Sequence, residues 1–309
     1  MKSIKSILLA VDSNSDRQTF VNEVADIAKE ASAKVTLLSV SDTPVYAQAM
    51  GAELSELRQL IQGDCLQIME AISSDLTEKG IQVTIRQSSG KRYLEIIRES
   101  LRGNHDLVMK SADSESAIEA FLFGSTDMQL FRMSPCPVWA FKPTSNKEIQ
   151  AVMVAVDLLA SDPEKSALAD SVLQWGKYVA SLHGAELHVA HVWSLYGEAT
   201  LRGRSVSSAT VDKLVQDEEQ KHCQWLDAAL EKNGLAQDQT KIHFHKGEPK
   251  QLIPDLASAI KADLLVMGTV GRTGIPGFFI GNTADSVLRQ VHCSVLAIKP
   301  EGFVTPVKI

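Results

Sequence analysis

Residues 266–284 read VMGTVGRTGIPGFFIGNTA, and this stretch decides how the chain is interpreted. It begins at the end of an apolar run, contains five glycines and leads into TADSVLRQV, whose apolar spacing is typical of a helix. A strand, a glycine-rich turn and a helix in succession are typical of parallel α/β sheets, whose ligands bind outside the carboxyl ends of the strands. We therefore expect a parallel sheet with this segment at its ligand-binding edge.

The chain contains two copies of this pattern. ADLLVMG (262–268) in the second half corresponds to HDLVMKS (105–111) in the first. Equivalent positions in this part of the copies lie 157 residues apart, as from Pro143 to Pro300. Near the start of each copy the offset is 145 residues, so the second copy is longer in its first half. A repeat that covers nearly the whole chain indicates tandem copies of one domain.

A short polar linker, TSNKE (144–148), separates the copies. It predicts a first domain at residues 1–143 and a second at residues 149–309. A length of 309 residues agrees with two domains of ordinary size.

The apolar runs of each copy predict the fold class, which is α/β. Runs such as SILLAV (6–11) are continuously apolar rather than alternating, as expected for parallel strands covered by helices on both faces. Helical spacing follows in YLEIIRESLR (93–102) and QLIPDLASAI (251–260), and Ser166 suits a helix start. We predict two tandem, Rossmann-like, doubly wound parallel sheets.

The last strand of each copy is expected at a sheet edge. These strands are PVWAF (137–141) and SVLAI (294–298), and an exposed apolar edge favours pairing with another strand. We predict that the two copies pair there around a pseudo-two-fold axis, as a dimer within one chain. A further homodimer of the full chain is left open.

Composition excludes several classes of protein. A net charge of −7 argues against a nucleic-acid binder, which needs a basic face. No apolar run approaches the roughly 20 residues of a membrane span. The N-terminal apolar run ends at Asp12, which indicates a first strand rather than a signal peptide. With four cysteines and no export signal, we expect reduced thiols and a cytoplasmic protein.

The glycine-rich segment has the chemistry of a phosphate site. Glycine removes the Cβ that would keep a ligand from the backbone amides, and a helix N-terminus adds unpaired N–H groups. Asn282 is expected to cap the helix, with Asp285 three residues later, and Arg272 adds a positive charge. The spacing matches neither GxxxxGK[ST] nor GxGxxG, so the sequence indicates neither a P-loop nor a dinucleotide-binding motif.

The spacing G-2x-G-9x-G, formed by Gly268, Gly271 and Gly281, resembles that of the universal stress protein family. It lies in the last loop of an α/β unit whose first strand ends in an aspartate, as in that family. The duplication resembles the family's two-domain, E-type members. This similarity extends over essentially the whole chain.

The resemblance implies an ATP site in the second copy. The family's adenosine-binding positions correspond to Asp157 and Val192, and the three glycines would hold the phosphates. The family's hydroxyl after the last glycine is Asn282 here, with Thr283 beside it. Arg272 is expected near the phosphates, and Mg²⁺ near Asp157 is consistent with bound ATP.

The first copy departs from the motif. Ser111 and Ser114 replace the first two glycines, whereas Gly124 and Ser125 keep the pattern of the last. The loop between them has no basic residue and three acidic ones, Asp113, Glu115 and Glu119. Because acids repel phosphate, we expect that the first copy does not bind ATP in the family manner.

Structural alternatives stay open at each position. The glycines could serve turns alone, and Asp157 could cap the loop that follows it. Histidines at 188 and 191 and at 243 and 245 suggest a metal, but the sequence places no acidic or cysteine ligand near either pair. We therefore expect no metal site.

No catalytic constellation is evident, since the chain has no GxSxG turn and no base placed to activate water. A nucleotide-binding sensor or regulatory module is the first hypothesis, and a weak ATPase is the second. The third is a non-nucleotide, apolar or lipid-like ligand held by PVYAQAM (44–50) and LIQGDCLQIM (60–69).

Overall fold

The computed structural model describes residues 3–12, 17–41, 52–112, 123–142, 148–159, 162–203, 207–235, 239–269 and 280–309, without the side chains of 17–19 and 52–62. The strands are β1 (Ser6–Val11), β2 (Lys34–Ser41), β3 (Val83–Ser89), β4 (Leu107–Ser111), β5 (Val138–Phe141), β6 (Ala151–Val156), β7 (Glu186–Trp193), β8 (Thr240–Lys246), β9 (Leu264–Gly268) and β10 (Ser294–Ile298). The helices are α1 (Arg17–Ala31), α2 (Ala52–Glu78), α3 (Arg92–Arg102), α4 (Ser125–Met133), α5 (Pro163–His183), α6 (Glu198–Arg202), α7 (Ser208–Lys232), α8 (Pro249–Ala259) and α9 (Asn282–Leu288).

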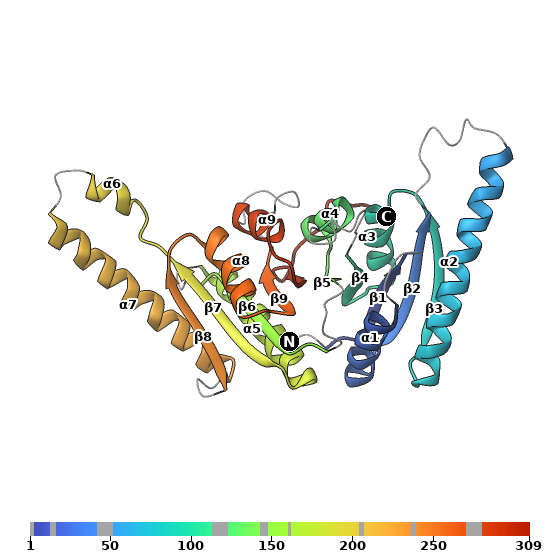
Figure 1. The fold of residues 1–309 in the computed structure, drawn as a ribbon, viewed down its shortest axis with the longest axis horizontal. Coiled ribbons are helices and arrows are strands. Elements are labelled where there is room, and N and C mark those ends of the chain that lie inside the picture. Colours follow the sequence, from blue (N-terminus) through green and yellow to red (C-terminus); the bar gives the residue numbers. More distant parts are fainter. Residues whose placement is uncertain are drawn as a thin grey trace.

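The described strands form one sheet in the order β3-β2-β1-β4-β5-β10-β9-β6-β7-β8 (Figure 1). Neighbouring strands are parallel within each copy. At the centre, β5 and β10 pair antiparallel, with Trp139 opposite Leu296. The order reads the same from either end once the copies are superposed. The predicted α/β class, tandem organisation and pairing of the last strands are therefore confirmed.

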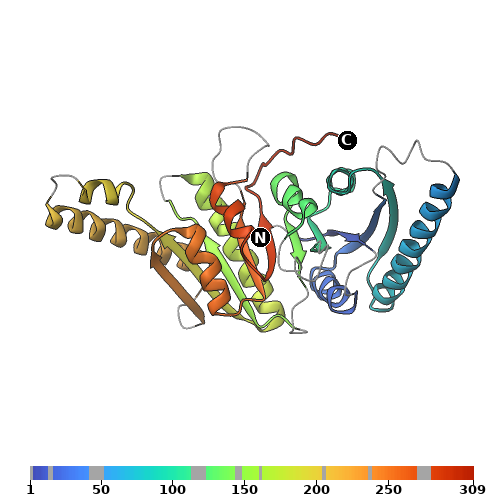
Figure 2. The ribbon, with the colours of Figure 1, turned by 45° about the horizontal axis from the view of Figure 1, so that its top comes forward.

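Helices cover both faces of the sheet, which explains why the strands are apolar on both sides (Figures 1 and 2). On one face, buried residues of α1, α2, α5 and α7 pack with alternate strand residues such as Leu9 and Val154. On the other face, α3, α4, α8 and α9 pack with the intervening residues, such as Leu8 and Met153. Each face of the sheet therefore has a core that runs through both copies.

Helix α5 begins earlier than the sequence indicated. Its N-cap is Asp162, whose carboxylate accepts from the backbone N–H groups of Glu164 and Lys165, and Pro163 is the first helical residue. Proline suits this position because it lacks an N–H that would have no partner there. The predicted start at Ser166 was wrong, because Asp162 offers a better cap one turn earlier.

Two buried lysines join the copies. Lys142 follows β5 and donates from Nζ to the carbonyl oxygen of Val291 at 2.9 Å. Lys299 follows β10 and donates to the carbonyl oxygens of Phe131 and Arg132 at the end of α4. Burial lowers the pKa of Lys142 to about 8 and that of Lys299 to about 7. Each copy thus places a lysine on backbone carbonyls of the other.

The C-terminal segment also crosses between the copies. After β10 the chain leaves the second copy and runs along the first (Figure 2). Arg98 of α3 donates to the carbonyl oxygen of Lys308 at 3.2 Å, and Val307 packs against the core of that face. On the opposite face, His183 of α5 lies 2.8 Å from Glu23 of α1. The junction is therefore held on both sides of the sheet.

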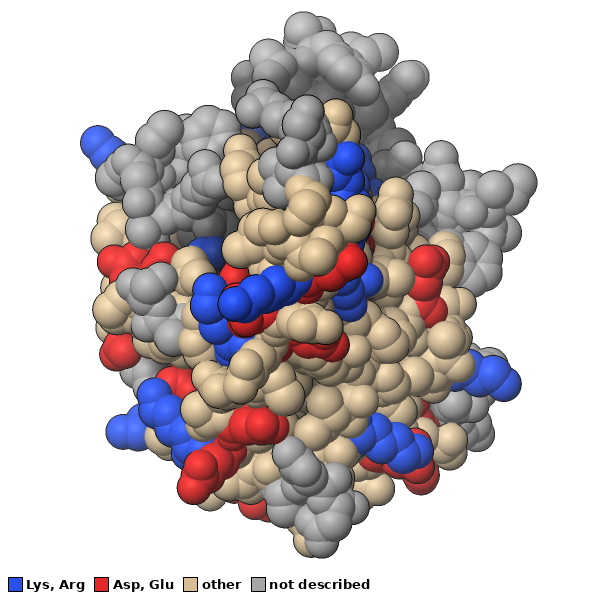
Figure 3. Space-filling view, turned by 90° about the vertical axis from the view of Figure 1, so that its left-hand side faces the viewer, with Lys and Arg blue, Asp and Glu red and all other residues tan. Residues whose placement is uncertain are grey.

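Charges of both signs lie close together at the end of the molecule that carries β8 and α7 (Figure 3). Glu198 lies 2.6 Å from Lys246 and 2.9 Å from Arg202, and Glu186 lies 2.7 Å from Lys241. Many of the charges at this end are therefore paired with a neighbour of opposite sign. Among the described helices, none combines the length and apolar composition that a membrane span requires.

Candidate functional site

The carboxyl edge of the second copy exposes backbone between two strands. β6 ends at Val156, which lies opposite His191 of β7. β7 continues for two residues, Val192 and Trp193, which are in register only with β8. Val192 therefore extends past the end of β6, at the level of Asp157. The structure brings these two predicted residues to the same edge.

Asp157 directly follows β6 at this edge of the sheet. Its side chain is 74% exposed, and its Oδ2 accepts from Nζ of Lys165 at 2.7 Å. Lys165 reaches it because the Asp162 cap fixes the first turn of α5. An exposed carboxylate with one cationic partner retains lone pairs for hydroxyl donors.

The glycine-rich segment is described only at its ends, and Gly271 and Arg272 lie outside the described residues. Gly268 ends β9, where an added Cβ would lie 2.8 Å from Cδ2 of Leu168 on α5. A side chain at this position would therefore require the end of the Leu168 side chain to move. This contact is not evident from the sequence, because Leu168 is a hundred residues away along the chain.

The start of α9 differs from the prediction. Gly281 is the N-cap, with a φ of −62°, so Asn282 is the first residue of the helix and Thr283 the second. No side chain caps the helix, and Asp285 instead lies 2.8 Å from Arg289. The predicted Asn282 cap was wrong, because the helix begins at Asn282 itself, one residue earlier than that cap requires. The first amides of α9 have no side-chain acceptor among the described residues.

Thr269 is a site residue that the sequence reasoning missed. It follows Gly268, and its carbonyl oxygen accepts from the N–H of Gly281 at 3.0 Å. Its side chain is fully buried, and its Oγ1 has no hydrogen-bond partner in the part of the chain that the structure describes. A buried hydroxyl without a partner is costly unless a ligand or water completes it. The signal was available, since a hydroxyl between two motif glycines has a polar function to fulfil.

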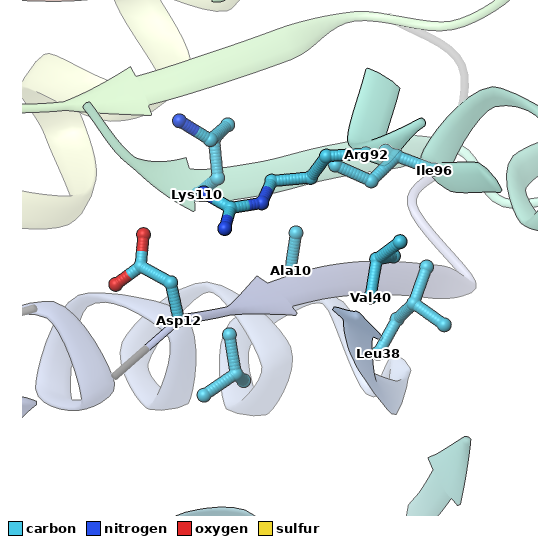
Figure 4. A pocket seen from close by; sticks show the side chains of 8 residues that line it. Ala10, Asp12, Leu38, Val40, Arg92, Ile96 and Lys110 are labelled. Atoms are coloured by element: carbon cyan, nitrogen blue, oxygen red, sulfur yellow. The ribbon is translucent and has the colours of Figure 1, made fainter. Parts of the chain in front are cut away.

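In the first copy, charged side chains fill the equivalent edge (Figure 4). Asp12 follows β1 as Asp157 follows β6, and Arg92 extends toward Asp12 and Lys110. The apolar floor is formed by Ala10, Leu38, Val40 and Ile96. The remaining cavity is about 10 Å³, the room of about one water molecule. A nucleoside does not fit there without displacing these side chains.

A buried ion pair marks the difference between the copies. Nζ of Lys110 lies 2.5 Å from Oδ1 of Asp127, and both side chains are almost fully buried. Oδ2 of Asp127 also accepts from the N–H of Gly124, the N-cap of α4. At the equivalent positions the second copy has Met267 and Ala284, which carry no charge. The helix start that is capped internally in the first copy thus lacks a side-chain cap in the second.

The hydrogen-bonded histidine pairs join different elements, and they are not the pairs of near neighbours in sequence, 188 with 191 and 243 with 245. Nδ1 of His188 lies 2.9 Å from Nε2 of His243, so β7 and β8 share one pair. Nε2 of His191 lies 2.8 Å from Nδ1 of His222 on α7. Over the described ranges, no group of three or more histidine, cysteine, aspartate or glutamate side chains is arranged to hold a metal ion.

The segments assigned to an apolar ligand give no support for one. Residues 44–50 lie outside the described residues. In the second segment, Ile68 and Met69 are buried in the core between α2 and the sheet. Core packing accounts for these two side chains.

The fold and the edge define a class of protein. Two doubly wound α/β units share one sheet, and each has an aspartate after its first strand and a helix start facing the same edge. This is a tandem α/β protein in which each copy has a candidate ligand-binding edge at the carboxyl ends of its strands. Residues 3–142 and residues 148–299 each match the sequence profile of the Universal stress protein family. The chain belongs to the universal stress protein family.

Curated relatives match over their full length. The chain is 28% identical to Universal stress protein E of Salmonella typhi over 314 residues, which covers 100% of this chain and 98% of that protein. It is 26% identical to Universal stress protein E homolog of Haemophilus influenzae, covering 96% of this chain and 97% of that protein. The resemblance to two-domain, E-type members is therefore confirmed.

Solved structures share the fold. A functionally unknown protein from Pseudomonas aeruginosa PAO1 superposes with a TM-score of 0.74 at 24% identity, covering 97% of this chain and 94% of that one. A universal stress protein from Archaeoglobus fulgidus gives 0.66 at 20% identity, covering 97% and 99%. At these identities the comparison establishes the fold.

Proposed function

We propose that the second copy binds ATP at the carboxyl ends of β6, β7 and β9, and that the protein acts as a nucleotide-dependent regulatory module in the stress response. The first copy supports the fold and binds no nucleotide. Adenosine would lie against Asp157 and the backbone of Val192. The phosphates would lie toward Gly268, Gly281 and the start of α9, where Gly271, Arg272, Asn282 and Thr283 are the remaining candidates.

The contrast between the copies carries this proposal. In the first copy, Asp127 caps α4 and Lys110 neutralises it, so the helix start is occupied from within. In the second copy the corresponding positions are apolar, and the buried Oγ1 of Thr269 has no partner among the described residues. A buried polar group left unsatisfied in this way supports a ligand site at this edge.

ATP fits the chemistry of this edge. The Asp157 carboxylate suits ribose hydroxyls, and an exposed strand backbone offers an N–H and a carbonyl oxygen to an adenine edge. Bound ATP adds negative charge at this edge, which a regulatory partner can recognise. Any Mg²⁺ would come with the phosphates. Asp157 pairs with a cation, Lys165, and the described residues form no cluster of side chains that could bind a metal ion without ATP.

Binding without turnover is the form of the proposal. Hydrolysis needs a base within hydrogen-bond reach of the attacking water. The described carboxylate at this edge, Asp157, is already paired with a lysine. We place the protein in the cytoplasm, since its four cysteines are free thiols, which are typical of a reducing compartment.

Titration calorimetry on protein freed of bound ligand tests the proposal, with two matched variants. Asp157→Asn should weaken adenosine and ATP alike by about 10- to 100-fold, the effect of losing hydrogen bonds to a charged group. Asp12→Asn, the equivalent change in the first copy, should leave both affinities unchanged. Phosphate release measured in parallel separates binding from turnover. Absence of binding heat with ATP in the wild type would refute the proposal.

A further inference from the structure

Two histidines on the α7 side of the second copy form a hydrogen-bonded chain that ends at the candidate site. His191 lies on β7 and is almost fully buried. Its Nδ1 is 3.1 Å from the carbonyl oxygen of Val156, and its Nε2 is 2.8 Å from Nδ1 of His222 on α7. That carbonyl belongs to the peptide that joins Val156 to Asp157. The chain therefore connects α7 to the backbone that carries the site carboxylate.

The proton positions in this chain follow from its chemistry. A carbonyl oxygen only accepts, so Nδ1 of His191 carries the hydrogen and its Nε2 offers a lone pair. That lone pair requires a donor, so Nδ1 of His222 also carries a hydrogen. Burial lowers the pKa of His191 to about 4 and also lowers the pKa of His222, so both rings are neutral at pH 7. Both hydrogens are thus directed toward Val156.

Aromatic packing fixes the orientation of the rings. The His222 ring stacks on Trp193 with centroids 5.6 Å apart and meets Trp225 edge-on at 4.8 Å. The His191 ring lies 6.0 Å from Phe244 of β8. Because these neighbours restrict rotation, the hydrogen bond to Val156 has a fixed direction. A buried polar chain held in this way specifies one local backbone conformation.

The first copy lacks this chain. Val11 of β1 is in register with Ser39 of β2, as Val156 is with His191. A serine is too short to extend from the strand to a covering helix as His191 does. The hydrogen-bonded chain is therefore found in the second copy and not at the equivalent position of the first.

We propose that His191 and His222 are a positioning pair that holds the Val156–Asp157 peptide for binding of a nucleoside. They keep the Asp157 carboxylate at a fixed spacing from the backbone of Val192, the residue that follows His191. Neither ring contacts the ligand, since both lie on the face of the sheet opposite to α8 and α9. This inference rests on the proposed function, because it names the residues that shape its ribose-binding end.

The surrounding charges set the order in which the pair takes up protons. Asp157, Glu218 and Lys221 are the charged groups that act on His222, and Oε1 of Glu218 lies 3.7 Å from its Nε2. His222 can be protonated at Nε2 without losing either hydrogen bond of the chain. His191 cannot, because its Nε2 would then face a donor. The chain is therefore expected to remain intact until His191 itself is protonated.

Two amide substitutions separate positioning from packing. In His191→Asn the amide nitrogen occupies the place of Nδ1, so donation to Val156 is kept. In His191→Gln the amide occupies the place of Nε2, so that donation is lost while the side chain remains polar and of similar size. Adenosine affinity should fall about fivefold in His191→Gln, the worth of one hydrogen bond, and by less than twofold in His191→Asn. Equal losses in the two variants would overturn the proposal.

A second readout uses the protein without ligand, so that it stands apart from nucleotide binding. Imidazole ¹⁵N shifts in the full chain should show both histidines with hydrogen on Nδ1. The backbone amide resonance of Asp157 should move in His191→Gln and stay in place in His191→Asn. His222→Phe, which preserves the ring stack, should leave the hydrogen on Nδ1 of His191, because the Val156 carbonyl still accepts it, and should move the Nε2 resonance of His191, which loses its donor. Hydrogen on Nε2 of His191 in the wild type, or an unmoved Asp157 amide in His191→Gln, would refute positioning even where adenosine binds. A wild type that shows these shifts but binds no adenosine would refute the proposed function alone.

Discussion

Replacing Lys110 and Asp127 by the residues of the second copy gives a sharp test of the filled site. In Lys110→Met, the Asp127 carboxylate stays fully buried and loses its cation, although the N–H of Gly124 still donates to it. Breaking a buried ion pair by removing one partner costs about 3–5 kcal/mol. Asp127→Ala should cost as much, because it leaves the Lys110 ammonium buried without its carboxylate and removes the cap of α4.

The double variant Lys110→Met/Asp127→Ala reproduces Met267 and Ala284 and removes both members of the buried pair. It should cost about 1 kcal/mol, the value of the lost cap, instead of the roughly 6–10 kcal/mol that additivity predicts. Denaturant unfolding of the full chain, followed by tryptophan fluorescence and checked for equal m-values, measures these free energies. Hydrogen exchange in β4 and α4 localises the change. A double variant as unstable as the sum of the single variants would refute the reasoning.

Three further outcomes are expected. Burial lowers the pKa of Lys299 to about 7, so between about pH 7 and 10 the unfolded chain binds more protons than the folded one. The free energy of unfolding should therefore rise with pH in this range, and the rise should be smaller in Lys299→Met. An equal pH dependence in the two proteins would contradict this. Separately expressed segments 1–145 and 146–309 should associate through β5 and β10 when mixed, as measured by light scattering, and well-folded segments that stay monomeric would count against it. Thr269→Val should raise the free energy of unfolding of the ligand-free protein by about 1 kcal/mol and weaken ATP binding, as measured by thermal unfolding and calorimetry. A less stable variant, or one that binds ATP more tightly, would contradict this.

The fold was predictable because its strongest signals are local and occur twice. Continuous apolar runs such as residues 6–11 indicated covered parallel strands, and the apolar last strands indicated the central pairing. Helix starts were less predictable, since several residues near each start are competent caps. Asp162 rather than Ser166 is the N-cap of α5, and Gly281 rather than Asn282 is the N-cap of α9, and the local sequence pattern does not decide between such neighbours.

The candidate site was predictable only in its positions along the strands. Asp157 and Val192 could be placed because the carboxyl ends of parallel strands meet at one edge. The contact of Gly268 with Leu168 and the chain from His191 to His222 could not, because each joins elements whose approach depends on helix packing. Aligning the two copies does reveal one of the missed features. A lysine at 110 opposite a methionine at 267 shows that the sites have diverged.

The reversal of strand direction between β5 and β10 gives the protein two ends with different chemical character. All strands of the first copy run against those of the second, so their carboxyl edges lie at opposite margins of the shared sheet before twist is considered. The edge at Asp157 and the edge at Asp12 therefore face away from each other, so a molecule that covers one of them leaves the other uncovered.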